Sequence, residues 1–99
     1  MMDISSQELQ KRLQDGENVN VLDVREEWEH EEMNIGNSKL IPLAELPFRL
    51  AEIEAWKAEE VVVYCYSGNR SGRAKEFLQS KGFEKVRNLL GGISEYFEE

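Results

Sequence analysis

The sequence predicts an α/β fold in which a small central parallel sheet carries helices on both faces. Short valine-rich runs alternate with amphipathic segments along the whole chain. No linker, internal repeat or low-complexity segment interrupts this alternation. Strands separated by helices pair in parallel, because each helix returns the chain to the same end of the sheet. We therefore expect strands and helices to alternate within a single domain that spans residues 1–99.

A helix and a strand open the chain. Ser5 stands three residues before Glu8, and this capping-box spacing predicts a helix that ends at Gly16. Residues 19–24 (VNVLDV) are mostly apolar and β-branched, which predicts a buried strand.

The middle of the chain predicts two helices around a brief strand. Residues 25–32 (REEWEHEE) form a short acidic helix for which Asp23 is the expected N-cap. Residues 39–43 (KLIPL) form the strand. In residues 45–56 (ELPFRLAEIEAW), three apolar residues share one helical face, and Pro47 is compatible with the first turn. The residues on that face are Leu46, Leu50 and Ile53.

The last third of the chain repeats the alternation twice. Residues 60–65 (EVVVYC) give the clearest prediction of a central strand. Residues 70–82 predict a helix that Gly82 stops. Residues 85–89 predict a short strand and residues 91–99 a final helix. In a parallel sheet of this kind, ligands bind beyond the carboxyl ends of the strands.

Composition excludes several classes of partner and cofactor. A net charge of −8 argues against nucleic acid and anionic membranes as partners. No apolar run approaches the roughly 20 residues that a membrane span needs. The single cysteine and single histidine leave no zinc or iron–sulfur cluster, and one thiol without a partner fits the reducing cytoplasm. We expect a cytoplasmic monomer without a structural metal site.

Cys65 stands where the predicted central strand turns into a helix. A free cysteine has a pKa of about 8.5, so a thiolate at neutral pH needs roughly 2.7 kcal/mol of differential stabilisation. A helix N-terminus supplies at best about 2 kcal/mol. Backbone N–H groups aimed at the sulfur and a nearby guanidinium can supply the remainder. Gly68 permits the positive φ of such a turn, and Arg70 closes it.

The charges around Cys65 favour a functional interpretation. No acid occurs in residues 61–75, although acids make up 20 of the 99 residues and about three are expected in such a window. Arg70 and Arg73 stand at a helix N-terminus, where acids are normally favoured. This stretch predicts a turn that receives an anion beside a thiolate.

Other candidate residues have simpler interpretations. Asp23 is expected to act only as an N-cap, and His30 to be a solvated residue on an acidic face. The larger aromatic residues are expected in the core rather than in a ligand site. They are Trp28, Trp56, Phe77, Phe83 and Phe97.

Three motifs make the sequence similar to single-domain rhodaneses, which are sulfurtransferases. VLDVREEWE resembles the Asp-Val-Arg-Glu segment of that family, and VVVYCYSGNRSGRA resembles its strand and active-site loop. GFEKVRNLLGGISEY resembles its C-terminal strand and helix. The resemblance implies a rhodanese-like fold and a persulfide on Cys65, formed from thiosulfate or a similar small anionic sulfur donor. It implies a thiol or cyanide as acceptor, with a protein acceptor as a further possibility, and no cofactor.

The resemblance also assigns the site. Cys65 is the catalytic nucleophile, the backbone after it cradles the sulfur, and Arg70 holds the anionic part of the donor. The substrate-binding residues that it implies are Tyr66, Ser67, Gly68, Asn69 and Arg70. Tyr66 departs from thiosulfate-using relatives, which often place a basic residue there. Tyr96 stands where relatives frequently have tryptophan, and is expected in the core.

Three alternatives remain open at this stage. A cysteine phosphatase also uses a thiolate in a loop closed by arginine, but its spacing resembles C-x5-R and the spacing here is C-x4-R. A regulatory module would keep the fold for binding alone. A persulfide carrier would pass sulfur to a protein partner and turn over thiosulfate poorly.

Overall fold

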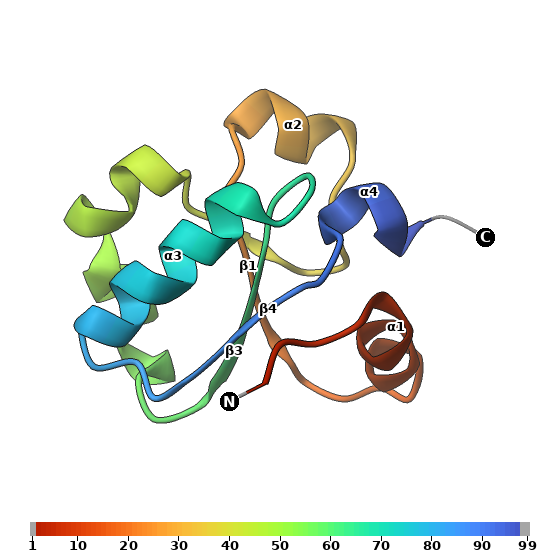
Figure 1. Ribbon diagram of the computed structural model, residues 1–99, viewed down its shortest axis with the longest axis horizontal. Helices are drawn as coiled ribbons and strands as arrows, with labels where there is room; N and C mark the ends of the chain where they lie inside the picture. Colours follow the sequence, from red (N-terminus) through yellow and green to blue (C-terminus); the bar gives the residue numbers. More distant parts are fainter. Residues whose placement is uncertain (1, 98–99) are drawn as a thin grey trace.

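The computed structural model describes residues 2–97 and contains a four-stranded sheet (Figure 1). The strand order is β2-β1-β3-β4, and every strand pairs in parallel with its neighbours. A parallel bridge between Ile4 and Leu89 extends the pairing beside β4. The predicted α/β class with a central parallel sheet is confirmed. The strands are β1 (Asn20–Asp23), β2 (Lys39–Leu40), β3 (Glu60–Tyr64) and β4 (Lys85–Asn88).

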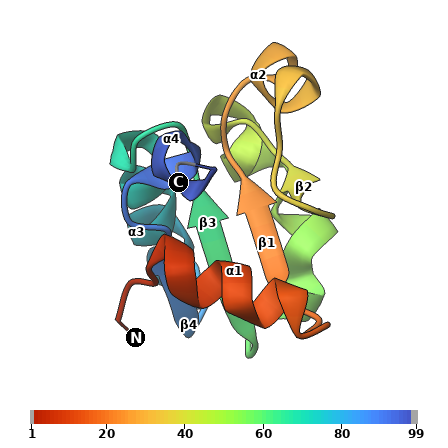
Figure 2. The ribbon, with the colours of Figure 1, turned by 90° about the vertical axis from the view of Figure 1, so that its right-hand side faces the viewer.

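Helices cover both faces of the sheet, as the sequence predicts. Helix α1 (Ser6–Gln14) crosses one face in Figure 2 and packs against α4 (Gly92–Tyr96). Helix α3 (Asn69–Ser80) and two 3-10 helices cover the other face. Alternate residues of β3 divide between the two cores, because successive side chains of a strand point to opposite faces. Val61 and Val63 face the α3 side, and Val62 and Tyr64 face the α1 side.

The register brings two distant segments to one rim of the sheet. Asp23 pairs with Tyr64, so β1 and β3 end side by side. Helix α2 (Glu27–Glu32) follows β1, and the loop that begins at Cys65 follows β3. Figure 1 shows this loop between α2 and α4. The segments that follow Asp23 and Tyr64 therefore meet at one edge of the sheet.

Some predicted elements differ from the structure, and the strand predicted over residues 39–43 is reduced to β2 (Lys39–Leu40). Residues 45–56 do not form one helix but the 3-10 helices η1 (Leu43–Phe48) and η2 (Leu50–Trp56). Pro47 lies inside η1, beyond its first turn. Arg49, with φ −126° and ψ 18°, interrupts the helical backbone between η1 and η2. The final helix α4 is shorter than expected and ends at Tyr96, and residues 98–99 of the predicted helix lie outside the described residues. Tyr96 itself is buried, as expected.

Helix α2 begins differently from the prediction. Its N-cap is Glu26, and the Glu26 N–H donates to Glu29 Oε1 at 3.0 Å. Asp23 is fully buried and caps no helix, because its carboxylate is occupied by Arg25 and His30. Among residues 2–97, no helix is long and apolar enough to cross a membrane.

Candidate functional site: a hydrogen-bonded cysteine loop

Cys65 lies at the floor of the loop that joins β3 to α3. Its side chain is buried, with 1% of its surface exposed. Gly68 has φ 113°, a left-handed conformation that favours glycine, and it is the N-cap of α3. The positive φ that the sequence predicts for Gly68 is thus observed, and the turn directs the Gly68 N–H at the sulfur.

Hydrogen bonds to the sulfur control the acidity of Cys65. Burial alone would raise the pKa of the Cys65 thiol, because it removes the charged form from water. The Ser71 hydroxyl and the backbone N–H groups of Ser71, Gly68 and Ser67 outweigh burial, and the pKa is lowered from its ordinary value. The Gly68 N–H lies 3.1 Å from Cys65 Sγ, and Ser71 Oγ lies 3.2 Å from it. The site therefore favours the thiolate.

Ser71 and Asn88 form a hydrogen-bonded pair behind the sulfur that sequence reasoning missed. Ser71 is fully buried, and its Oγ lies 2.6 Å from Asn88 Oδ1. Asn88 Nδ2 donates to the Gly68 carbonyl at 3.1 Å, which turns Asn88 Oδ1 towards Ser71. A hydroxyl carries one proton, so Ser71 donates at any moment either to Asn88 or to the sulfur. The sequence offered one indication of this role, because Asn88 lies at the carboxyl end of a predicted strand, where ligands of a parallel sheet bind.

Arg70 forms an ion pair with an acid, although the sequence around it contains none. Its Nη atoms hold the carboxylate of Glu29 on α2 at 2.7 and 3.0 Å. The hydrogen bond from Arg70 is the main cause that lowers the pKa of Glu29 to about 2. The acid that neutralises Arg70 is 41 positions away in sequence. A window along the chain cannot detect it, because it arrives through the fold.

The remaining predicted substrate-binding residues form the outer part of the loop. Tyr66, Ser67 and Asn69 are exposed. The Tyr66 carbonyl accepts from the Ser94 N–H of α4 at 2.9 Å, so it is turned towards α4. Arg73 on α3 is exposed as well. The structure thus brings Gly68 and the Ser67 N–H to the sulfur, whereas Tyr66 presents its side chain to the surface.

A buried charged cluster supports the rim beside the loop. Arg25 and Asp23 form a buried ion pair, with 2.8 Å between Arg25 Nη2 and Asp23 Oδ2. His30 Nδ1 lies 2.9 Å from the same carboxylate oxygen, so His30 is a partner of Asp23 rather than a solvated residue. The Arg25 guanidinium also donates to the Met33 carbonyl and lies 5.4 Å from the centre of the Tyr64 ring. This cluster fixes the start of α2 above the site.

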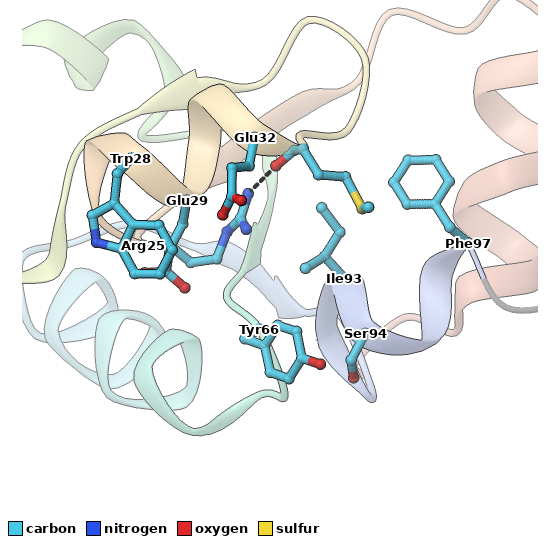
Figure 3. A pocket seen from close by; sticks show the side chains of 9 residues that line it. Arg25, Trp28, Glu29, Glu32, Tyr66, Ile93, Ser94 and Phe97 are labelled. Carbon is cyan, nitrogen blue, oxygen red and sulfur yellow. Dashed lines mark hydrogen bonds between the residues drawn. The ribbon is translucent and has the colours of Figure 1, made fainter.

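A cavity of about 510 Å³ opens beside Tyr66 (Figure 3). Two aromatic residues expected in the core, Trp28 and Phe97, are instead 63% and 52% exposed. Figure 3 shows them on opposite sides of this cavity. Phe83 is buried as predicted, whereas Trp56 and Phe77 are partly buried against the core. The cavity is lined by Arg25, Trp28, Glu29, Glu32, Met33, Tyr66, Ile93, Ser94 and Phe97.

The fold and this site define a parallel α/β domain built around a hydrogen-bonded cysteine loop. Within residues 2–97, no group of three or more histidine, cysteine, aspartate or glutamate side chains is placed to hold a metal ion. The loop offers a buried sulfur whose hydrogen bonds lower the pKa of the thiol and so make its thiolate easier to form.

Comparison with known proteins identifies the family. The family model for the rhodanese-like domain matches residues 5–99. A sulfurtransferase of Allochromatium vinosum is 38% identical over 92% of this chain and 83% of its own. The human single-domain sulfurtransferase TSTD1 superposes with a TM-score of 0.83 at 26% identity, over 98% of this chain and 96% of that one. The chain therefore belongs to the rhodanese-like domain family, and its relatives support a role in sulfur transfer.

Other relatives differ in length. The putative sulfur carrier protein YrkF of Bacillus subtilis is 33% identical over 95% of this chain, which spans 50% of YrkF. A rhodanese-like domain protein from Staphylococcus aureus superposes with a TM-score of 0.85 at 30% identity, over 100% of this chain and 94% of that one. The same fold is thus similar both to proteins of its own size and to parts of larger ones.

Proposed function

We propose that the protein moves a sulfane sulfur from thiosulfate or a similar donor to a thiophilic acceptor through a persulfide on Cys65. In the first half-reaction the Cys65 thiolate attacks the outer sulfur of thiosulfate, the donor S–S bond breaks, and sulfite leaves with the electron pair. In the second, a thiolate or cyanide attacks the outer sulfur of the persulfide, and Cys65 leaves as a thiolate. Ping-pong kinetics are the expected fingerprint. Neither half-reaction requires a metal or an organic cofactor.

The observation that carries this proposal is the set of donors around Cys65 Sγ. The Gly68 N–H at 3.1 Å and Ser71 Oγ at 3.2 Å stabilise the attacking thiolate and, later, the thiolate that leaves. The same groups lower the pKa of Cys65. The C-x4-R loop is one residue shorter than the loop of a cysteine phosphatase, and a narrower cradle suits one sulfur better than a tetrahedral phosphate. We therefore favour sulfur transfer over phosphate hydrolysis.

The other loop residues receive roles in the same proposal. The backbone from Tyr66 to Arg70 holds the outer sulfur of the persulfide. Arg70 binds the anionic part of the donor in exchange for Glu29, with which it pairs at 2.7 Å. Tyr66 in place of a basic residue favours a sulfane donor other than thiosulfate in the cell. We place the reaction in the cytoplasm, where a free thiol persists.

A persulfide carrier is the second candidate function. It is favoured by the likeness to a putative sulfur carrier protein and by the exposed acidic faces of the chain. The enzyme and the carrier differ in the acceptor. Turnover with small thiols supports the enzyme, and transfer only to a protein supports the carrier. A module that only binds would form no persulfide at all.

The test is the intact mass of the reduced protein after brief exposure to thiosulfate, with Cys65→Ser measured alongside. We expect the parent alone to gain the mass of one sulfur atom and to lose it on addition of cyanide. If thiosulfate gives no gain, mercaptopyruvate and a protein persulfide are the next donors. Failure with all three would contradict the proposed function.

A further inference from the structure

Apolar side chains gather around the cavity beside the cysteine loop. Four large apolar side chains that line it are more than half exposed, which is unusual when they form one patch. They come from three parts of the chain: α2 and the residue after it, the cysteine loop, and the C-terminal end of α4. The exposed fractions are 63% for Trp28, 51% for Met33, 58% for Tyr66 and 52% for Phe97.

This cavity is joined directly to the loop that carries the nucleophile. Tyr66, which lines it, is the residue after Cys65. The Ile93 N–H donates to the Cys65 carbonyl at 2.9 Å, and the Ser94 N–H donates to the Tyr66 carbonyl at 2.9 Å. Ile93 and Ser94 both line the cavity (Figure 3). Whatever occupies the cavity therefore lies against the backbone of the cysteine loop.

The charges around the cavity are predominantly negative. Its two nearby arginines are already matched, Arg25 by Asp23 and Arg70 by Glu29. Glu32 lines the cavity and is exposed. Glu27 and Glu31 are exposed on the same helix α2, and the whole chain carries a net charge of −8. A positively charged partner is therefore attracted to this surface and an anionic one is repelled.

We propose that this cavity is the docking site for a protein segment that carries the acceptor cysteine on an apolar stretch flanked by lysine or arginine. The inference rests on the proposed sulfur transfer and names its acceptor. A small molecule held inside the cavity leaves the outer faces of Trp28 and Phe97 in water. A chain segment laid across the cavity covers both, and its basic residues face Glu32.

The transfer step is balanced without any further reactant. The acceptor thiolate attacks the outer sulfur of the Cys65 persulfide and forms a new S–S bond. The bond between that sulfur and Cys65 Sγ breaks, and Cys65 keeps the electron pair as a thiolate. The acceptor cysteine becomes the persulfide, and the outer sulfur keeps whatever proton it carried.

The test compares three short synthetic peptides as acceptors of sulfur from the persulfidated full-length protein. Each has one cysteine: the first flanks it with leucine and lysine, the second replaces lysine by glutamate, and the third replaces leucine by serine. Transfer is followed by mass spectrometry, with cyanide as a small acceptor in parallel. We expect the first peptide to react at least about tenfold faster than either other peptide, and the advantage over the glutamate peptide to shrink at high salt.

Matched variants locate the docking site. Glu32→Lys and Phe97→Ser should each lower the rate with the first peptide at least about fivefold relative to the rate with cyanide. Glu84→Lys makes the same charge change before β4, at the opposite end of the sheet, and Phe48→Ser removes an exposed aromatic residue from η1. Neither control should alter that ratio.

The outcomes separate the two proposals. Persulfide formation and cyanide turnover with equal rates for all three peptides would overturn the docking site and leave the proposed function intact. If the control variants lower the ratio of the peptide rate to the cyanide rate as much as Glu32→Lys and Phe97→Ser do, the docking site is overturned as well, because the effect is not local. Absence of any persulfide would instead contradict the proposed function.

Discussion

At the scale of individual residues, the pKa of the Cys65 thiol depends on single hydrogen bonds to its sulfur. A buried sulfur would ordinarily hold its proton, and the Ser71 hydroxyl is the first of the groups that oppose this. Asn88 competes with the sulfur for the Ser71 proton across 2.6 Å. The balance between these two acceptors sets how readily the thiolate forms.

Replacing Ser71 by alanine should therefore make the thiol less acidic. We expect the pH profile of Cys65 alkylation by iodoacetamide to move to higher pH, and the rate at pH 7 to fall roughly fivefold, as the loss of a hydrogen bond of about 1 kcal/mol implies. Ser80→Ala is the matched control, because Ser80 is exposed near the other end of α3 and bonds the Phe77 carbonyl. A profile for Ser71→Ala that overlays the parent would show that the hydroxyl does not act on the sulfur.

The ion pair between Arg70 and Glu29 makes a second prediction at this scale. Glu29→Gln leaves the guanidinium without its neutralising charge, so the pKa of Cys65 should fall and alkylation at pH 7 should accelerate. Arg70→Ala leaves the carboxylate alone, so the pKa of Cys65 should rise. The pKa of Glu29 is about 2, so the pair stays charged throughout the titration of the thiol.

The double variant provides the control for that pair. With both charges removed, the profile should return close to that of the parent at equal ionic strength. If neither single variant changes the pH profile of alkylation, the ion pair has a structural role only and does not influence the pKa of Cys65.

At the scale of elements, α4 holds the cysteine loop in place. A Cβ atom on Gly92 would lie 2.3 Å from the Tyr66 carbonyl oxygen and 2.7 Å from that of Cys65. These neighbours are backbone atoms, which cannot turn aside as a side chain does. The start of α4 and the loop are therefore packed with no room for a side chain between them.

Gly92→Ala should destabilise the protein and distort the site together. We expect a loss of about 3 kcal/mol or more in the free energy of unfolding, measured with urea, and a matching loss of persulfide formation. Gly16 has φ +81° and nothing within 4 Å of the position of its Cβ, so Gly16→Ala should cost only about 1–2 kcal/mol and leave persulfide formation unchanged. Equal costs at both positions would show that positive φ, and not the close approach, is the constraint.

The helices show where sequence patterns succeed and where they fail. Leu46 and Ile53 are buried as their spacing predicts, yet the segment is two 3-10 helices. Pro47 cannot donate a backbone hydrogen bond, which disfavours a continuous α-helix, and the apolar spacing reports only which side chains face the core. Asp23 was misassigned for a related reason, because a local cap and a buried partner of Arg25 look alike in sequence.

At the scale of the whole molecule, an ionic network ties three elements together. Glu60 of β3 accepts hydrogen bonds from Arg12 of α1 at 2.6 Å and from Arg87 of β4 at 2.9 Å. The hydrogen bond from Arg12 is the main cause that lowers the pKa of Glu60 below its ordinary value. A carboxylate whose pKa is lowered by folding stabilises the fold above its ordinary pKa and loses that contribution as the pH falls.

The midpoint of urea unfolding should therefore fall as the pH is lowered from 5 towards 2, through the protonation of Glu60 and Glu29. Glu60→Gln should cost about 2 kcal/mol at pH 7, between the values for exposed and buried pairs, and should flatten this pH dependence. Glu54→Gln removes an exposed carboxylate 3.3 Å from Lys57 and should cost under about 0.5 kcal/mol. A Glu60→Gln variant with the steep acid dependence of the parent would assign the acid response to other carboxylates.

The assembly of the whole molecule explains why some residues of the site could not be predicted from the sequence. The α/β class, the strand that precedes Cys65 and the turn at Gly68 follow from local patterns. Glu29 and Asn88 reach the site only because neighbouring strands end at the same edge of the sheet. Their roles depend on register and on side-chain direction, which are properties of the assembled sheet.

The contacts between the cysteine loop and α4 also order events during synthesis. The Cys65 and Tyr66 carbonyls are held by the N–H groups of Ile93 and Ser94, and Ile4 pairs with Leu89. A ribosome adds the residues from Cys65 to Ser94 in about two to six seconds at usual rates, and these hydrogen bonds cannot form before then. We expect a stalled nascent chain that ends before α4 to carry a thiol that iodoacetamide alkylates like a cysteine in an unfolded peptide. The groups that lower the pKa of the Cys65 thiol would then be assembled only after α4 has been synthesised.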